Sequence, residues 1–132
     1  MLNGKITFWK SLKSGIRGGL IAAGVNVGWL FSLTYFLTIQ GIPKGFPIAV
    51  VFSTILPIAL AALLFAFLLI NFKKGNVLFY LIAAGFTLLS IFPSFQPILP
   101  DGNPAPANFA ILTVPMHFFA AIIGVFYIAK GK

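Results

Sequence analysis

Four long apolar segments, at residues 18–39, 48–70, 76–92 and 107–129, make up most of this chain. None of them contains Lys, Arg, Asp or Glu. An α-helix needs about 17–25 such residues to cross the roughly 30 Å hydrocarbon core of a bilayer, and each segment is about that long. The sequence therefore predicts an all-α fold, a bundle of four transmembrane helices.

The positive charges lie almost entirely on one side of these segments. Of the nine lysines and arginines, only Lys44 lies in the first or third connection. The others precede the first segment, lie in the second connection at Lys73 and Lys74, or follow the fourth segment. Because cytoplasmic loops are enriched in Lys and Arg, we expect both termini and the second connection to be cytoplasmic. The chain would then be a multi-pass protein of the cell membrane.

Composition argues against a soluble domain and against a nucleic-acid partner. Hydrophobic residues make up 60% of the chain and charged residues 8%, whereas soluble domains carry about 25% charged residues. The net charge of +8 comes from residues that flank the apolar segments rather than from one basic face. Such cations suit the anionic lipid headgroups of the cytoplasmic face. We therefore expect the lipid bilayer, and no nucleic acid, as a partner.

The scarcity of reactive side chains limits the chemistry open to a single chain. The sequence has no Cys, its one acidic residue is Asp101 in the third connection, and its one histidine is His117. These counts exclude a thiolate metal site and a multi-histidine metal or haem site, and they make an active site with a Ser-His-Asp triad or paired carboxylates hard to assemble. We expect no metal, no cofactor and no catalytic residue.

Two flanking segments have distinctive compositions. Residues 1–17 are basic, with apolar residues at helical spacing, which predicts a short interfacial helix over 4–17. A disordered basic tail is the alternative. The connection at 93–106 holds more than half of the prolines, so we expect a stiff, extended cap over the outer end of the bundle, without a helix and with a turn at 101–103.

Small residues indicate which helix faces pack. In the first segment they form two stripes on roughly opposite faces. One stripe is Gly24, Gly28 and Ser32, and the other is Gly15, Gly19, Ala22, Asn26 and Trp29. Small side chains let membrane helices approach closely, so this helix is either central in the bundle or makes a homo-oligomer contact. In the fourth segment, Ala120 and Gly124 mark the face that we expect to be buried.

Two further patterns concern helix shape and orientation. Pro57 and Pro115 each remove a backbone hydrogen bond, which predicts kinks in the second and fourth segments. Small and polar residues of the third segment fall near one face, which we expect to point into the bundle. They are Asn76, Tyr80, Ala83, Thr87 and Ser90.

Asn26 and His117 both fall close to the membrane midplane. An unpaired polar group in hydrocarbon costs several kcal/mol, so both side chains should face inward and find partners. In one interpretation they bond to each other, or to Thr87 and Thr113, and hold the helices together. In the other, these four residues form the floor of an outward-opening pocket beneath the proline-rich connection. Carbonyls freed by the two prolines, at Ser53 or Ile111, would join that pocket.

Several motifs occur in a characteristic order. The first span is led by Arg17 and contains Ala22-Ala23 and Asn26-Val-Gly-Trp29, the second follows a short Pro-Gly connection, and the fourth contains Thr113-Val-Pro-Met116-His117. This order resembles an uncharacterised family of small bacterial four-span membrane proteins, a domain of unknown function. The resemblance would cover about residues 15–130. It implies the four-span topology and a bacterial inner-membrane location and singles out His117, but it implies no activity.

Three functional interpretations remain open. The leading one is a small, non-enzymatic membrane protein that acts through contacts with lipid or with a membrane partner protein. The second is a carrier or binding protein for a small, largely apolar molecule, held in an outward-facing pocket around His117. The third is an accessory subunit of a redox or quinone-handling complex, because a lone histidine among aromatic residues could bond to a quinone carbonyl.

Overall fold

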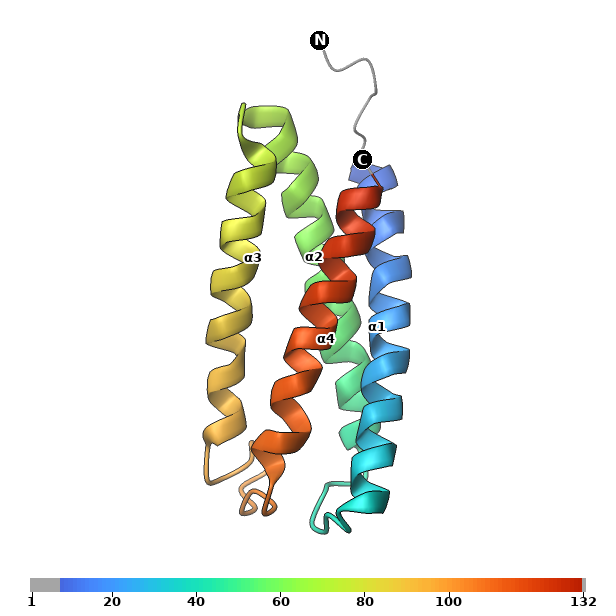
Figure 1. Ribbon diagram of the computed structural model, residues 1–132, viewed down its shortest axis with the longest axis vertical. Helices are drawn as coiled ribbons and strands as arrows, with labels where there is room; N and C mark the ends of the chain where they lie inside the picture. The colour runs from blue at the N-terminus through green and yellow to red at the C-terminus, as the bar shows by residue number, and fades with distance from the viewer. Residues whose placement is uncertain (1–7, 132) are drawn as a thin grey trace.

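The computed structural model describes residues 8–131. Its elements are α1 (Phe8–Phe36), α2 (Phe46–Asn71), α3 (Gly75–Ile91), the 3₁₀ helix η1 (Phe92–Phe95) and α4 (Phe109–Lys130). α1, α2, α4 and the combined α3–η1 are long and apolar enough to cross a membrane, which confirms the predicted all-α fold with four spans. The two described chain ends lie together at the terminal end of the bundle, and segments 37–45 and 92–108 lie at the opposite, loop end (Figure 1).

The helices are more continuous than predicted. Residues 8–17 are helical as expected, but they continue into the first span as one helix, α1, rather than forming a separate one. Their placement at the membrane interface stays a prediction, and residues 4–7 lie outside the described ones. No proline stops α1, and long basic side chains can extend from a spanning helix to the headgroups. Pro57 and Pro115 lie inside α2 and α4 without ending either helix. The kinks at these prolines stay a prediction.

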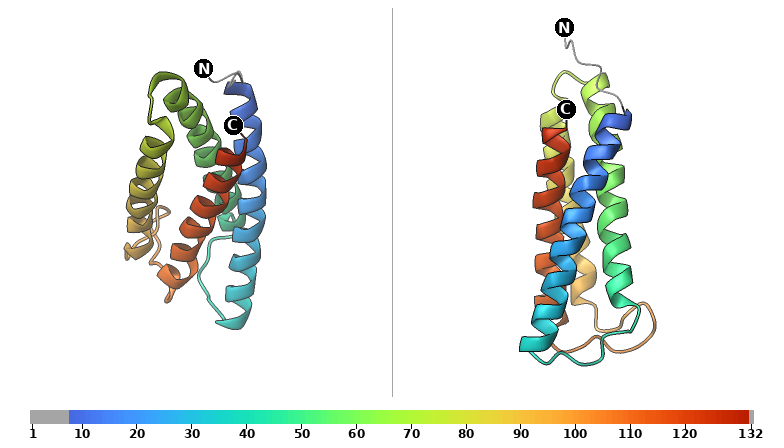
Figure 2. Two further views of the ribbon diagram at one scale, coloured as in Figure 1. Left: turned by 45° about the horizontal axis from the view of Figure 1, so that its top comes forward. Right: turned by 90° about the vertical axis from the view of Figure 1, so that its right-hand side faces the viewer.

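α2 and α4 form the centre of the bundle, with α1 on one side and α3 on the other (Figures 1 and 2). In the described part of the chain, α1 packs against α2 and α4 but not against α3. A glycine-lined face of α1 makes this contact. A Cβ at Gly15 would lie 2.5 Å from the Cβ of Ala62, and one at Gly19 would lie 3.2 Å from the Cα of Ile55. The predicted stripe from Gly15 to Trp29 is thus the packed face of α1.

The other predicted stripe of α1 does not pack within the chain. Gly24, Gly28 and Ser32 are exposed, and a Cβ at either glycine would have no atom within 4 Å. Their predicted contact with a helix of this chain is wrong, because α2 and α4 occupy the opposite face of α1. The homo-oligomer alternative stays a prediction. In α4 the predicted face is inward: Gly124 is buried, and Ala120 packs beside the core.

Two apolar clusters hold the bundle. The cluster nearer the terminal end includes Phe65 of α2, whose ring centroid lies 4.8 Å from that of Phe79 of α3. The cluster nearer the loop end contains Leu30, Val50, Leu112 and Met116. There the Trp29 Nε1 donates to the carbonyl oxygen of Leu112 at 2.9 Å. α1 is therefore tied to α4 by a hydrogen bond as well as by close packing.

α3 is turned somewhat differently from the prediction. Its Ala83, Thr87 and Ser90 are partly buried as expected, but Asn76 and Tyr80 are exposed and Phe79 is buried instead. Asn76 lies in the first turn of α3, where its amide can be solvated at the membrane surface. The Phe79 ring has no polar atom and packs on Phe65, so it is the better residue to bury.

The 92–108 segment has more local structure than an extended cap. Phe92–Phe95 form η1, which contradicts the prediction of no helix, because proline is tolerated in the first turn of a helix. Ile98 and Pro104 then form an antiparallel bridge around a turn. In that turn the backbone N–H of Asn103 donates to Asp101 Oδ1 at 3.0 Å, so the turn predicted at 101–103 is confirmed.

Candidate functional site

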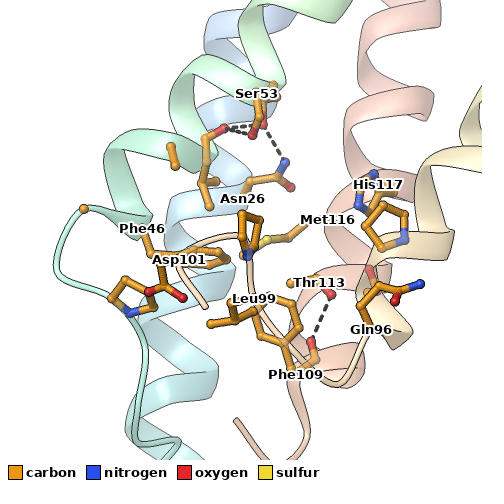
Figure 3. A pocket seen from close by; sticks show the side chains of 18 of the residues that line it. Asn26, Phe46, Ser53, Gln96, Leu99, Asp101, Phe109, Thr113, Met116 and His117 are labelled. Carbon is orange, nitrogen blue, oxygen red and sulfur yellow. Dashed lines mark hydrogen bonds between the residues drawn. The ribbon is translucent and has the colours of Figure 1, made fainter. Parts of the chain in front are cut away.

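A cavity of about 670 Å³ lies at the loop end, between α1, α2, α4 and the 92–108 segment (Figure 3). We name it the loop-end cavity. Pro93, Leu99 and Pro100 belong to its wall, so the proline-rich segment covers the bundle as predicted. Most of the wall is apolar. Its polar side chains are those of Asn26, Ser53, Thr54, Ser94, Gln96, Asp101, Thr113 and His117.

Asn26 is the most deeply buried polar residue of this cavity, at 2% exposed. Its Nδ2 donates to Thr54 Oγ1 at 3.1 Å, and Thr54 Oγ1 donates to the carbonyl oxygen of Val50 at 2.7 Å. Because the hydroxyl has a single proton, it can only accept from Asn26, which fixes the orientation of the amide. Asn26 Oδ1 points away toward Met116 (Figure 3) and is buried without a hydrogen-bond partner among residues 8–131.

Ser94 supplies a second unpaired group on the same wall. It lies in η1, is 5% exposed, and its Oγ also has no hydrogen-bond partner in the described part of the chain. About nine in ten buried polar groups in proteins are hydrogen-bonded. Both oxygens belong to residues that line this cavity, so they are candidate partners for a group bound within it.

A second cavity, of about 580 Å³, lies between α2, α3 and α4. We name it the interhelical cavity. Its wall is apolar over most of its length, with Thr87 and Ser90 contributed by α3. The residues that line both cavities are Ser53, Thr54, His117 and Ala120. His117 therefore stands where the two cavities meet.

The structure brings three of the four predicted polar residues to one cavity. Asn26, Thr113 and His117 line the loop-end cavity, whereas Thr87 lines only the interhelical one. The pocket prediction is therefore wrong for Thr87, because α3 packs on the far side of α2 and α4. Of the two predicted carbonyl positions, Ser53 belongs to the wall and Ile111 is exposed outside it.

The predicted bonds among these residues do not form. Within residues 8–131, no hydrogen bond joins Asn26 to His117. Thr87 and Thr113 instead donate to carbonyl oxygens one turn back in their own helices, at 2.7 and 2.9 Å. A threonine hydroxyl in a helix can always reach that carbonyl, so it does not need a partner on another helix. The helix-linking bond of Asn26 goes to Thr54.

Sequence analysis did not select Thr54 or Ser94 as site residues. Thr54 shares α2 with Ser53, and helical spacing alone does not show which of the two hydroxyls faces α1. Ser94 lies in a segment expected to be extended, and its burial depends on η1. The signal available in the sequence was that Thr54 is a polar residue one helical turn before Pro57.

The charge of the loop-end cavity is low. No described Lys or Arg lines it, and Asp101 is its one acidic wall residue. Asp101 is fully exposed, and hydrogen bonds from the backbone and side chain of Asn103 lower the pKa of its carboxyl below the usual value. The described residues contain no cluster of three His, Asp or Glu side chains that could hold a metal. The cavity thus offers hydrogen bonds and apolar surface.

Searches against protein families, curated proteins and solved structures found no match to this chain. The resemblance to a four-span bacterial family therefore stays a prediction. The chemistry of the two cavities is the remaining guide to function.

Proposed function

We propose that this multi-pass membrane protein binds a small, largely apolar molecule that carries a hydrogen-bond donor, in the loop-end cavity. The observation that carries the proposal is the buried, unpaired Asn26 Oδ1 of a residue on a mostly apolar wall. An unsatisfied buried acceptor costs about 1–3 kcal/mol, and a ligand hydroxyl or N–H would recover it. Concave apolar sites with a few polar groups are the usual form of small-molecule sites.

The proposed role is binding without chemistry. His117 and Asp101 are the titratable side chains on the cavity wall. In the described part of the chain, neither is hydrogen-bonded to a serine or threonine, so no activated nucleophile is present. His117 offers an imidazole at the base of the cavity, where a second polar group of the ligand could bond. Of the three interpretations of the sequence, this geometry favours the binding protein.

The orientation of the bundle is part of the proposal. The terminal end carries Lys73, Lys74 and all other described cations except Lys44, so we place it in the cytoplasm and the loop-end cavity on the outer side. A reporter fused after Lys132, or inserted between Lys73 and Lys74, should report cytoplasm. A reporter inserted at Gly102 should report the outside. The reverse pattern would overturn the orientation.

A photoreactive short alcohol tests the binding site. We would add hexanol with a diazirine next to the hydroxyl to the protein in vesicles, irradiate, and locate the label by peptide mass spectrometry. The label should concentrate on residues of the loop-end cavity such as Thr113 and Met116. Equal labelling of the exposed helix faces would overturn the proposal.

Variants at the unpaired acceptor sharpen that experiment. Asn26→Leu keeps nearly the same side-chain size but removes the acceptor, so labelling of the cavity should fall severalfold. The matched control is Asn71→Leu, since the Asn71 amide is exposed at the end of α2 and bonds to its own helix. His117→Gln keeps a hydrogen-bonding group and should retain part of the labelling, whereas His117→Leu should not. Equal labelling in all four variants would remove both side chains from the site.

A further inference from the structure

The interhelical cavity extends the proposed site in a direction that defines the class of ligand. We infer that the ligand is a single-chain amphiphile with an uncharged, hydroxyl-bearing head, its head in the loop-end cavity and its hydrocarbon chain in the interhelical cavity. This inference rests on the proposed function and adds the chemical class of the molecule and the path of its chain.

The two cavities share a boundary that one molecule can cross. Ser53 and Thr54 line both of them from α2, and His117 and Ala120 line both from α4. Ala120 is small, and the Thr54 hydroxyl is already bonded to Val50 and Asn26. On the α2 side the boundary therefore presents satisfied hydroxyls to a hydrocarbon chain that passes it, and on the α4 side it presents Ala120 and the His117 ring.

The length of the interhelical cavity matches a lipid chain. Along α3 its wall extends from Ser90 to Phe79, which at about 1.5 Å per residue corresponds to about 16 Å. The half-thickness of the hydrocarbon core, and so the depth of one leaflet's chains, is about 15 Å. A chain that starts at the loop end would run parallel to the neighbouring lipids.

The interhelical cavity also opens toward the bilayer. Leu60 of α2 and Phe86 of α3 line it and are nevertheless 65% and 61% exposed. A chain can therefore enter sideways from the membrane, without the tail passing through water. An apolar molecule with no head would gain nothing over the surrounding lipid, which is as apolar as the wall. The head must therefore supply the specificity.

The polar groups define that head. Asn26 Oδ1 is an acceptor with no partner, so the head must donate a hydrogen bond, and the Ser94 hydroxyl can accept or donate a second one. Among residues 8–131, neither Lys nor Arg lines the wall, and the Asp101 carboxylate lies at its edge. A phosphate or carboxylate head would therefore be desolvated without a counter-charge on the described wall. A hydroxyl head meets all of these conditions.

Two photoreactive probes separate this inference from the proposed function. Both are hexadecanol, one with the diazirine beside the hydroxyl and one with it at the far end of the chain, used with the protein in phosphatidylcholine vesicles. The first should label the loop-end cavity at Thr113 or Met116. The second should label the interhelical cavity at Phe79 or Leu64, and excess unlabelled hexadecanol should reduce both labels.

A matched pair of α3 variants controls the chain position. Ala83 lines the interhelical cavity, whereas the adjacent Ala84 is exposed and does not line it. Ala83→Phe should reduce far-end labelling of the cavity severalfold and leave head-end labelling in place, and Ala84→Phe should change neither. A bound head with far-end label only on exposed faces overturns the chain path and leaves the proposed function standing. Head-end label absent from the loop-end cavity, with short and long alcohols alike, overturns both.

Palmitic acid with the same far-end diazirine tests the head. At a pH where its carboxylate is ionised, it should label the interhelical cavity severalfold less than the alcohol does. Equal labelling by the acid would overturn the assignment of an uncharged head.

Discussion

α1 and α3 flank the same central pair of helices, yet they are attached to it very differently. α1 buries eight of its 29 residues, most of them small, and α3 buries only Gly75 and Phe79. Glycines let the backbone of α1 approach α2 and α4 closely, whereas α3 rests mainly on one aromatic ring. In a bilayer, where lipid is as apolar as leucine, the difference shows that close backbone approach rather than hydrophobicity attaches a helix.

The loose attachment of α3 also creates the second cavity. The cavity beside α1 lies only at its loop end, around Asn26, whereas the interhelical cavity of about 580 Å³ extends along α3 from Ser90 to Phe79. A helix that is attached mainly through one buried aromatic residue can accommodate a hydrocarbon chain beside it. Four predictions test this difference in attachment between α1 and α3, from the largest expected effect to the smallest.

The largest effect should come from removing the one aromatic residue that anchors α3. Phe79→Ala deletes a ring that is 1% exposed and packed on Phe65, which typically costs about 3–5 kcal/mol. Unfolding in mixed detergent micelles, followed by circular dichroism, would measure the loss. The control is Phe86→Ala on the same helix, whose ring is largely exposed and whose loss should cost far less. Similar losses for both would mean that α3 is held along its length.

Overpacking the α1 contact should come next. Gly15→Leu places a side chain where even a Cβ would lie 2.5 Å from Ala62 and 3.1 Å from the carbonyl oxygen of Ile58. Inserting atoms into a packed contact costs about 1–3 kcal/mol, measured by the same unfolding experiment. Gly24→Leu is the matched control, because that position is open. If Gly24→Leu were equally destabilising, Gly24 would contact a second copy of the chain or a partner.

These two glycines show where sequence analysis succeeds and where it stops. Hydropathy and length predicted α2, α3 and α4 close to their observed ends and missed the start of α1 by ten residues. The expense of burying polar groups in lipid placed Asn26 and His117 inward. Both stripes of α1 looked equally able to pack, because small residues permit close approach without specifying the partner. Which stripe is used depends on Ala62 and Ile55, which belong to another helix.

The same limit applies to the site. The sequence predicted a cavity beneath the proline-rich segment, with Asn26, Thr113 and His117 on its wall. It assigned Thr87 to that cavity and overlooked Thr54, because a hydroxyl at the right depth on any helix is an equally good candidate. Only the position of α3, which does not pack against α1, keeps Thr87 out of the loop-end cavity that Thr54 lines.

The hydrogen bond between Asn26 and Thr54 should contribute less than either packing contact. A double-mutant cycle with Asn26→Leu and Thr54→Val should give a coupling energy of about 0.6 kcal/mol, and at most about 2 kcal/mol, as for other interhelical bonds in membranes. The readout is again unfolding in mixed micelles. Additive effects would show that this bond contributes nothing to the attachment of α1 to α2.

The smallest effect is expected from one substitution made in α1 and in α3 at the same local sequence. Leu20-Ile-Ala-Ala-Gly24 in α1 recurs as Leu81-Ile-Ala-Ala-Gly85 in α3, and both glycines are open. Replacing a mid-helix glycine by alanine favours the helix by about 0.5–1 kcal/mol. In α3, which opens locally because little packing holds it, Gly85→Ala should slow amide hydrogen exchange by a factor of about 2–5, the equivalent of that free energy.

In α1 the same change should be almost silent, because opening there must first separate the packed glycine face from α2 and α4. Hydrogen exchange in detergent, read by mass spectrometry on peptides from each helix, would compare Gly85→Ala with Gly24→Ala directly. The five residues are identical and both glycines are exposed, so a difference between the two helices would reflect how the rest of each helix is packed. Equal slowing in both would contradict a loosely held α3, and with it the reason for expecting a hydrocarbon chain beside that helix.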